Sequence, residues 1–398
     1  MKETKNVPQL RFSGFDDNWK EVIFSEIFTE RHDISTITKN YPQLSFTIAE
    51  GVIRPEDRKT NQRDFLIKDK ENKQYLKTEL NDIIYNPANV VFGAIHRNGL
   101  GNGVLSPIYK IFYTNEDSVF LEGIVRNPEF IKKIANQTEG TVTKLKTLKP
   151  ENFLQMRSFI SPYLQEQQKI GTFLSHVDSL IQAKTKKLES LKAIKKSLLQ
   201  KCFPKAGEKV PEMRFAGFSG DWEEKEFIEL VSRESKTNIS DENNPCVEYE
   251  DVTPEIGILN NDVYKKKVRK TGISFDNKNI LYGKLRPYLH NWLKPNFEGV
   301  AVGDWWVLEP NNVDRDFLYR LIQTKEFDDI ANQSSGSKMP RADWNLISHS
   351  TFSVPMNIEE QQKIGQFFSK YDSLICAQQK EIDKLKGIKK SLLQKMFV

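Results

Sequence analysis

A stretch of 38 residues that occurs twice constrains this chain more than any other feature of its sequence. Residues 166–203 read EQQKIGTFLSHVDSLIQAKTKKLESLKAIKKSLLQKCF, and residues 360–397 read EQQKIGQFFSKYDSLICAQQKEIDKLKGIKKSLLQKMF. The copies are identical at 25 of 38 positions and lie 194 residues apart. Apolar residues recur in both copies with helical spacing. Each copy therefore predicts a long helix, spanning roughly 57 Å at about 1.5 Å per residue.

Within each helix the apolar residues follow a heptad pattern with a polar interruption, which is typical of helices that pair. The candidate seam residues are Ile170, Val177, Leu191 and Leu198 in the first helix and Ile364, Tyr371, Leu385 and Leu392 in the second. A companion series runs through Phe173, Leu180, Ile194, Phe367, Leu374 and Ile388, and the residues Leu174, Ile181 and Leu188 widen the apolar stripe of the first helix. If the two halves fold alike, a pseudo-twofold axis relates the helices, which favours antiparallel pairing. The alternative is that each helix packs only on its own domain.

A shorter motif repeats as well, and it opens each half of the chain. VPQLRFSGFDDNW at residues 7–19 returns as VPEMRFAGFSGDW at residues 210–222, whereas the segments between motif and helix hardly align. In each half the opening motif and the helix are repeated while the segment between them differs, which indicates a common scaffold that carries a variable part. We predict four segments: variable domains at 1–160 and 205–355, a central helix at 161–204 and a C-terminal helix at 356–398.

The divergent middles alternate strand-like and helical runs, so the predicted fold class is α+β, with two similar mixed domains. The predicted strands cover 43–48, 82–91, 108–113, 279–281, 299–302 and 305–308. The predicted short helices cover 18–28, 128–134 and 316–328. The repeated aromatics Phe12, Phe15, Trp19, Phe215, Phe218 and Trp222 are interpreted as core anchors rather than base-stacking platforms.

Charge and cysteine content limit the functional classes. The net charge is +5, but the two repeated helices carry about +9 together, so the remaining residues are slightly acidic. Contacts of the domains with a polyanion must therefore come from local clusters of basic residues. Three scattered cysteines argue against a disulfide framework or a zinc site. With no apolar N-terminal run and no long apolar segment, we expect a cytoplasmic protein without a membrane contact.

Motifs of catalysis are absent from the sequence. No phosphate-binding GxxxxGK[ST] loop occurs, the five histidines are isolated, and no glycine fingerprint follows a strand. The run Asn86–Asn89 lacks the second proline and the aromatic residue of the adenine methyltransferase motif. These absences favour a non-catalytic binding protein over a nuclease or methyltransferase with diverged motifs. They predict neither a bound metal nor a bound cofactor.

The repeated motifs VPxxRFxGFxxxW, EQQKIG and KxIKKSLLQKxF, each present twice in the same order, resemble those of the specificity subunits of type I restriction-modification enzymes. The resemblance implies that the two variable domains read the halves of a split site in double-stranded DNA. It also implies that the repeated helices form an antiparallel coiled coil, set the half-site spacing and dock two modification subunits. Methyl transfer with S-adenosylmethionine and ATP- and Mg-dependent translocation and cleavage would then belong to modification and restriction partners. A coiled-coil scaffold without sequence readout is the alternative.

Candidate DNA-reading residues lie in polar stretches of the two variable domains. They are Arg54, Lys59, Arg97 and Asn98 in the first domain and Lys284, Arg286, Lys338 and Arg341 in the second. In the major groove an arginine fork pairs with guanine and an asparagine with adenine. The loop at 282–288, YGKLRPY, resembles a recurrent loop of the family.

Overall fold

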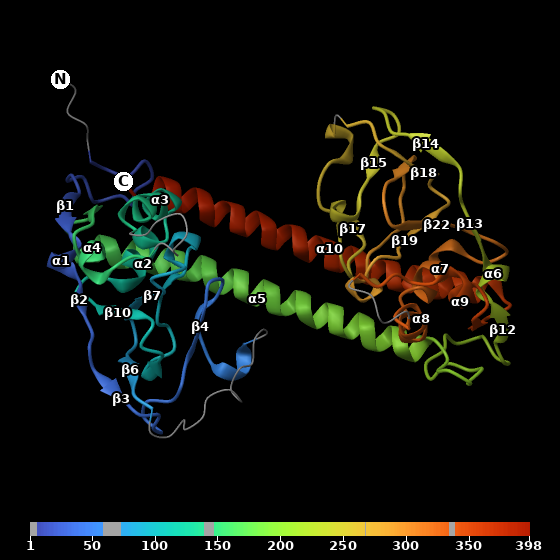
Figure 1. Ribbon diagram of the computed structural model, residues 1–398, viewed down its shortest axis with the longest axis horizontal. Coiled ribbons are helices and arrows are strands. Elements are labelled where there is room, and N and C mark those ends of the chain that lie inside the picture. The colour runs from blue at the N-terminus through green and yellow to red at the C-terminus, as the bar shows by residue number, and fades with distance from the viewer. Residues whose placement is uncertain (1–5, 59–72, 139–146, 267, 334–338) are drawn as a thin grey trace. The chain divides into compact units, whose positions relative to one another are not determined.

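The chain divides into two compact units in the computed structural model, which describes residues 6–58, 73–138, 147–266, 268–333 and 339–398 (Figure 1). Unit 1 comprises Met1–Gln182 and Asp383–Val398, and unit 2 comprises Ala183–Ile382. The two predicted long helices are present as α5 (Leu164–Cys202) and α10 (Ile358–Lys395), and each contributes residues to both units. No helix in the described part of the chain is long and apolar enough to cross a membrane. The four segment boundaries drawn from the sequence stay a prediction.

Unit 1 combines short strands with short helices. Its strands are β1 (Lys20–Ile23), β2 (Thr29–Glu30), β3 (Ile34–Ser35), β4 (Ser45–Thr47), β5 (Gly51–Ile53), β6 (Tyr75–Thr78), β7 (Ile83–Tyr85), β8 (Ile95–Arg97), β9 (Gly103–Leu105), β10 (Lys110–Tyr113) and β11 (Arg157–Ile160). Its short helices are α1 (Phe24–Ile27), α2 (Ser118–Val125), α3 (Pro128–Gln137) and α4 (Pro150–Leu154), with 3-10 turns η1 (Pro55–Asp57) and η3 (Val90–Phe92). Among the described residues, the main sheet is antiparallel in the order β2-β10-β7-β8, beside the sheet β3-β6-β9 and the pairs β1-β11 and β4-β5.

Unit 2 repeats this plan. Its strands are β12 (Glu223–Glu226), β13 (Val231–Arg233), β14 (Thr237–Ile239), β15 (Cys246–Val247), β16 (Val252–Thr253), β17 (Ile258–Leu259), β18 (Thr271–Phe275), β19 (Ile280–Gly283), β20 (Trp292–Leu293), β21 (Gly299–Ala301), β22 (Trp305–Pro310) and β23 (Thr351–Val354). Its short helices are α6 (Phe227–Leu230), α7 (Arg315–Leu321), α8 (Lys325–Ala331) and α9 (Trp344–Ser348), with 3-10 turns η4 (Tyr249–Asp251), η5 (Val263–Lys265) and η6 (Pro287–Leu289). The sheet β13-β22-β19-β20 and the pair β12-β23 match β2-β10-β7-β8 and β1-β11 of unit 1.

This correspondence confirms the expected mixed α/β class, and several predicted elements are present. Strands predicted at 43–48, 108–113, 279–281, 299–302 and 305–308 correspond to β4, β10, β19, β21 and β22, and the helix predicted at 128–134 is α3. Three predictions are wrong in part. Of the strand predicted at 82–91, only residues 83–85 form a strand, β7, and η3 begins at Val90. Residues 20–23 of the predicted helix 18–28 form β1, because their edge pairs with β11. The helix predicted at 316–328 is split into α7 and α8, since Thr324 caps a new helix by accepting a hydrogen bond from the Phe327 N–H.

Within unit 2 the two long helices lie side by side and run antiparallel. Lys184 of α5 pairs with Glu381 of α10, with Nζ and Oε1 2.7 Å apart. Eleven residues further along α5, Lys195 pairs with Asp372, with Nζ and Oδ1 also 2.7 Å apart. The residue number on α10 falls as that on α5 rises, which is the antiparallel order. The apolar contact here comes from Leu188, Ile375 and Ile382, with Leu191 packed against them.

The helix pairing in unit 1 uses the equivalent positions. Lys389 of α10 pairs with Asp178 of α5, with Nζ and Oδ1 2.5 Å apart. Lys389 and Asp178 are the repeats of Lys195 and Asp372 at the offset of 194. Equivalent residues thus make equivalent helix contacts in both units.

The predicted seam residues divide between helix pairing and attachment to the domains. Ile170 and Ile364 are buried in the cores of units 1 and 2, and Leu392 and Leu198 pack against those same cores. Leu191 faces the partner helix, while Val177, Tyr371 and Leu385 are half-buried. Both packing modes considered from the sequence are therefore present.

The predicted companion series is mostly exposed. Phe173, Leu180, Ile194, Leu374 and Ile388 are each between 37% and 54% exposed. The buried stripe lies one position later, at Leu174, Leu188, Cys202, Phe368, Ile375, Ile382 and Met396. Heptad spacing fits both series, and the packing of the helices on the domains decides between them.

The repeated opening motif fastens the start of each long helix. Arg11 donates from Nε and Nη2 to the two carboxylate oxygens of Glu166, at 2.6 and 2.9 Å, and the Glu166 side chain is fully buried. In unit 2, Arg214 bonds Glu360 in the same way, at 2.7 and 2.8 Å. The Arg of VPxxRF and the Glu of EQQKIG are thus two halves of one buried ion pair.

An aromatic residue just after each long helix packs in the core of a unit. Phe397, which follows α10, lies edge-on to Trp19 in unit 1, with ring centroids 6.2 Å apart. Phe203, which follows α5, makes the same contact with Trp222 in unit 2, at 5.9 Å. Both tryptophans are nearly fully buried, which confirms them as core anchors. Each core therefore contains the start of one long helix and the end of the other.

Candidate nucleic-acid interface

Two loops of unit 2 are joined by backbone hydrogen bonds and bring together three of the basic residues predicted to contact DNA. We call residues 283–290 and 339–342 the paired loops. The Arg286 N–H donates to the Pro340 carbonyl at 2.7 Å, and the Ala342 N–H donates to the Lys284 carbonyl at 2.8 Å. Leu285 and Arg341 form an isolated antiparallel bridge between these bonds. Residues 54 to 58 positions apart in the sequence thus share one surface.

Asp304, just before β22, lies between the basic side chains of the paired loops. Its carboxylate accepts from Arg341 Nε at 3.0 Å and Nη2 at 3.1 Å, and its Oδ1 lies 3.8 Å from Lys284 Nζ. The hydrogen bond to Asp304 raises the pKa of Arg341. The Arg341 side chain is still 52% exposed. Asp304 was not among the predicted residues, because no local sequence signal connects it with Arg341, 37 positions away.

The backbone of the first loop adopts an unusual conformation. Arg286 and His290 have φ angles of 48° and 55°, in the left-handed region that side chains other than glycine rarely occupy. Such strain concentrates at functional sites, where the surrounding structure holds it in place. The Tyr249 hydroxyl donates to the Leu285 carbonyl, and its ring packs on Trp305. Contacts from the core therefore fix the shape of this loop.

Two acidic residues lie beside His290, the last residue of the first loop. His290 Nε2 lies 3.0 Å from Asp328 Oδ1, and His290 Nδ1 lies 3.8 Å from Glu255 Oε1. The hydrogen bond to Asp328, followed by that to Glu255, raises the pKa of His290 to about 9. The imidazole is therefore protonated at neutral pH. Between Arg286 and His290, Tyr288 is 52% exposed.

Among the basic residues of the paired loops, Arg286 has a guanidinium nitrogen without a hydrogen-bond partner among the described residues. Its Nε is buried and has no hydrogen-bond partner among the described residues. A buried donor without an acceptor is costly, and such groups in native structures often face a ligand or water.

In unit 1 the predicted residues are not brought together in this way. Arg54 is exposed immediately before η1. The Arg97 side chain is only 20% exposed, and its Nη1 donates to Asn81 Oδ1 at 2.9 Å. Lys59 in unit 1 and Lys338 in unit 2 lie outside the described residues.

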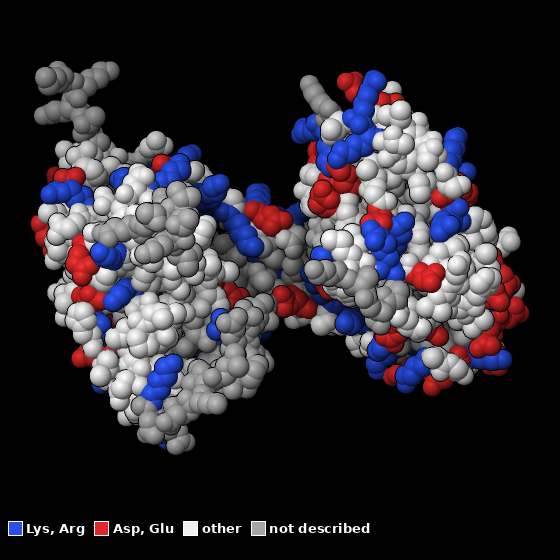
Figure 2. Space-filling model, viewed as in Figure 1, with Lys and Arg blue, Asp and Glu red and all other residues white. Residues whose placement is uncertain are grey.

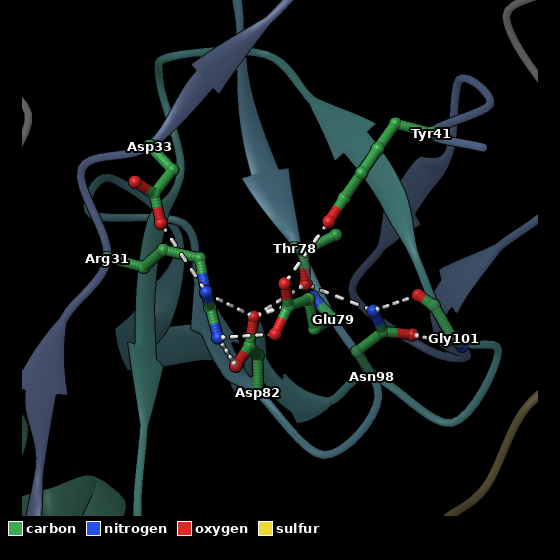
Figure 3. A network of polar contacts seen from close by, with 8 residues as sticks. All are labelled: Arg31, Asp33, Tyr41, Thr78, Glu79, Asp82, Asn98 and Gly101. Carbon is green, nitrogen blue, oxygen red and sulfur yellow. Dashed lines mark hydrogen bonds and ion pairs between the residues drawn. The ribbon is translucent and has the colours of Figure 1, made fainter. Parts of the chain in front are cut away.

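The prediction that Asn98 reads a base does not fit the structure. Asn98 is fully buried, and its Nδ2 donates to Thr78 Oγ1 at 3.0 Å and to the Gly101 carbonyl at 2.8 Å. Its Oδ1 accepts from the Leu100 N–H at 2.9 Å. These bonds use both ends of the amide to hold the turn after β8 (Figure 3).

The same network continues to the buried carboxylate of Asp82, which was not predicted from the sequence. Asp82 is 2% exposed and accepts from Arg31 Nε at 2.9 Å and from the Glu79 N–H at 2.7 Å (Figure 3). Burial raises the pKa of Asp82, although the bond to Arg31 opposes that shift. Thr78 donates to Asp82 and accepts from Asn98, so it links the two parts of the network. The network is a structural support of unit 1.

Surface charge is mixed in both units. Figure 2 shows Lys and Arg side chains interspersed with Asp and Glu on the visible face of each unit, without one continuous positive face. In unit 2, Lys266 pairs with Glu248 at 3.1 Å, and Lys270 pairs with it at 2.5 Å. The charges of Lys266 and Lys270 are thus partly neutralised within the chain. The paired loops remain the best-formed basic site among the described residues.

Comparison with known proteins finds a matching domain family and distant relatives. Residues 219–387, which include the paired loops, match the type I restriction modification DNA specificity domain. Over 253 residues the chain is 23% identical to the type I restriction enzyme MjaVIII specificity subunit of Methanocaldococcus jannaschii, covering 58% of this chain and 59% of the relative. Over 122 residues it is 27% identical to the EcoDI specificity subunit of Escherichia coli, covering 30% of this chain and 27% of that one.

Solved structures show the same fold at low sequence identity. The crystal structure of a type I restriction-modification S subunit from M. genitalium matches with a TM-score of 0.58 and 15% identity, covering 98% of this chain and 99% of that chain. A chain from a study of complex assembly in the type I restriction-modification system matches with a TM-score of 0.52 and 14% identity, covering 98% and 99%. The resemblance that the repeated motifs predicted is confirmed: residues 219–387 match the DNA specificity domain of type I restriction-modification systems, and the chain is similar to a specificity subunit over about 59% of that relative's length.

Proposed function

We propose that this chain is the sequence-specific DNA-binding subunit of a type I restriction-modification complex, and that the paired loops of unit 2 read bases in one half of its site. The main support is the convergence of Lys284, Arg286 and Arg341 on one surface inside the region that matches the DNA specificity family. An arginine fork that reaches a guanine edge contributes about 1–3 kcal/mol of discrimination. A scaffold without sequence readout is not favoured, because the matching family is one of DNA specificity domains.

We further propose the architecture implied by the sequence repeats. Two target recognition domains, at 1–160 and 205–355, would be joined by the helices at 161–204 and 356–398 as an antiparallel coiled coil with pseudo-twofold symmetry. The repeated ion pairs and aromatic contacts support equivalent roles for the two halves. The helices would set the distance between the half-sites of double-stranded DNA.

Catalysis would belong to other subunits of the complex. We propose that two modification subunits dock on the repeated helices and carry the adenine methyltransferase activity with S-adenosylmethionine. Restriction and translocase subunits would bring the ATP- and Mg-dependent steps. This chain would bind no cofactor or metal itself, and the complex would act in the cytoplasm.

Footprinting of the complex with its modification subunits tests the proposed function. Protection of two short blocks with an unprotected gap, at a defined sequence, supports it. Protection that is the same on unrelated sequences refutes it.

Arginine substitutions then assign the reading site. Arg341→Ala should relax selection at one base pair by about 1–3 kcal/mol and leave other positions unchanged. Arg157→Ala is a matched control, since Arg157 is an exposed arginine paired with Glu21 in unit 1. Equal weakening on every sequence would make Arg341 a phosphate contact instead.

The helices can be tested separately from the loops. Inserting one heptad into both long helices adds roughly 10 Å, or about three base pairs at about 3.4 Å each. The preferred spacer should lengthen accordingly in methylome sequencing, with both half-sites unchanged. An unchanged spacer would mean that the helices do not set it.

A further inference from the structure

Asp304 is the one acidic residue among the described residues that contacts two of the basic side chains in the paired loops. It binds Arg341 at two points and lies near Lys284, as described above. Its backbone carbonyl also accepts from the Lys284 N–H at 2.9 Å. The carboxylate is 25% exposed, so it faces the same solvent as the arginine.

A carboxylate that accepts two hydrogen bonds from an arginine fixes the orientation of its guanidinium group. The Nε and Nη2 bonds fix the plane of the guanidinium, which a single bond would leave free to rotate. An exposed arginine otherwise samples many rotamers, and ordering it on DNA costs binding free energy. Asp304 supplies that order before DNA arrives.

The negative charge of Asp304 also affects which part of the DNA, a phosphate or a base edge, Arg341 can contact. A backbone phosphate that approaches Arg341 meets the Asp304 carboxylate, and such a like-charge contact is unfavourable. The edge of a base is neutral and meets no such repulsion. A carboxylate in this place thus weakens contacts that carry no sequence information more than contacts that do.

We propose that Asp304 is a positioning residue for sequence discrimination in unit 2: it orients Arg341 and keeps it from binding phosphates. This proposal rests on the proposed DNA-reading function of the paired loops. It assigns to Asp304 an effect on the ratio of specific to non-specific binding rather than on affinity as such.

The test uses the full chain assembled with its modification subunits and the Asp304→Asn variant, which keeps the size of the side chain and one acceptor oxygen. Three short duplexes are compared: the site found by methylome sequencing, the site with the half read by unit 2 scrambled, and the site with the other half scrambled. Affinity is measured over a range of salt concentrations. Glu212→Gln is the matched control, because it removes one exposed acidic charge, paired with Lys201, elsewhere in unit 2.

We expect Asp304→Asn to bind the duplex with the scrambled unit 2 half-site about tenfold more tightly while affinity for the intact site changes by less than about threefold. The dependence of log affinity on log salt for the scrambled duplex should steepen by about 0.9, as for one added phosphate contact. Discrimination at the other half-site should be unchanged. The control variant should alter none of these ratios.

A double variant separates positioning from loop stability. If Asp304 acts through Arg341, adding Asp304→Asn to Arg341→Ala should change the specificity ratio by less than about twofold. An unchanged ratio and salt slope in the single variant would overturn the proposal, as would equal weakening on all three duplexes with a lowered melting temperature. If the unaltered complex itself fails to distinguish the duplexes, the proposed function fails and not this inference alone.

Discussion

The buried ion pair that fastens each long helix allows a prediction with a built-in comparison. Replacing Arg11 by Ala leaves the carboxylate of Glu166 buried without its cation, and replacing Arg214 does the same to Glu360. The two carboxylates are 0% and 2% exposed, so neither is solvated when its partner is removed. Breaking a buried pair in this way costs about 3–5 kcal/mol.

One residue makes the two losses unequal. The Ser161 hydroxyl donates to Glu166 Oε2 at 2.5 Å, while the repeat of Ser161 is Pro355, which has no hydroxyl. Glu166 therefore keeps one donor in Arg11→Ala, and Glu360 keeps no side-chain donor among the described residues in Arg214→Ala. A hydrogen bond to a charged group contributes about 1.5–3 kcal/mol. We expect about 3 kcal/mol for Arg11→Ala and about 5 kcal/mol for Arg214→Ala.

Calorimetry with hydrogen exchange read by mass spectrometry measures both changes. With about 2–4 °C per kcal/mol for a unit of this size, the transitions should fall by about 6–12 °C and about 10–20 °C. Exchange should rise around Trp19 in the first variant and around Trp222 in the second. Adding Ser161→Ala to Arg11→Ala should bring its cost up to that of Arg214→Ala. Losses below about 1 kcal/mol in both units would show that the pairs behave as solvated surface pairs and would refute the reasoning.

Three further predictions concern single positions. Gly365→Ala should destabilise unit 2 by about 1–3 kcal/mol in denaturant unfolding, because the new Cβ would lie 2.5 Å from the Cβ of Asp316. Gly387→Ala is the control: the space around Gly387 is open, so the substitution should stabilise α10 by about 1 kcal/mol. Because the pKa of His290 is raised to about 9, its charge contributes stability that is fully present below about pH 6.5 and is lost as the pH rises through about 9. This contribution to the free energy of unfolding is on the order of 3 kcal/mol. The variant Asp328→Asn should therefore flatten the pH dependence of the free energy of unfolding. Asn98→Ala should destabilise unit 1 by about 1–3 kcal/mol and leave base selection in a methylome unchanged; altered selection would restore Asn98 as a reader.

The long helices were predictable because their signal is local and repeated. Heptad spacing identified α5 and α10, and the repeated opening motif identified equivalent anchors. The register of the buried face was not predictable in the same way. Leu174 and Phe173 are both apolar and adjacent, so periodicity fits either one. Contacts with residues far along the chain, such as Gly123 beside Leu174, decide which of them is buried.

The candidate site was predictable only where sequence neighbours also share a surface. Lys284 and Arg286 belong to one loop, and the structure adds Arg341 to that surface through backbone hydrogen bonds. Asn98 has a side chain of a type that often reads bases, but its amide makes hydrogen bonds within unit 1. Whether a polar side chain supports a turn or faces solvent depends on groups such as Thr78, which precede it by twenty residues and carry no motif.

The repeated and the divergent residues differ in the interactions that they make. A buried pair such as Arg11 with Glu166 needs both partners, because either one alone would leave a charge without solvent or counter-ion. An exposed residue such as Arg341 can be replaced at little cost to the core, since its neighbours remain solvated. Asp304 belongs with the second group: in the proposed site its change would alter which DNA groups Arg341 can approach, while the helix attachments remain as they are. Under this proposal a new specificity requires changes on the loops and on the acidic residues beside them, and not in the repeats that hold the helices.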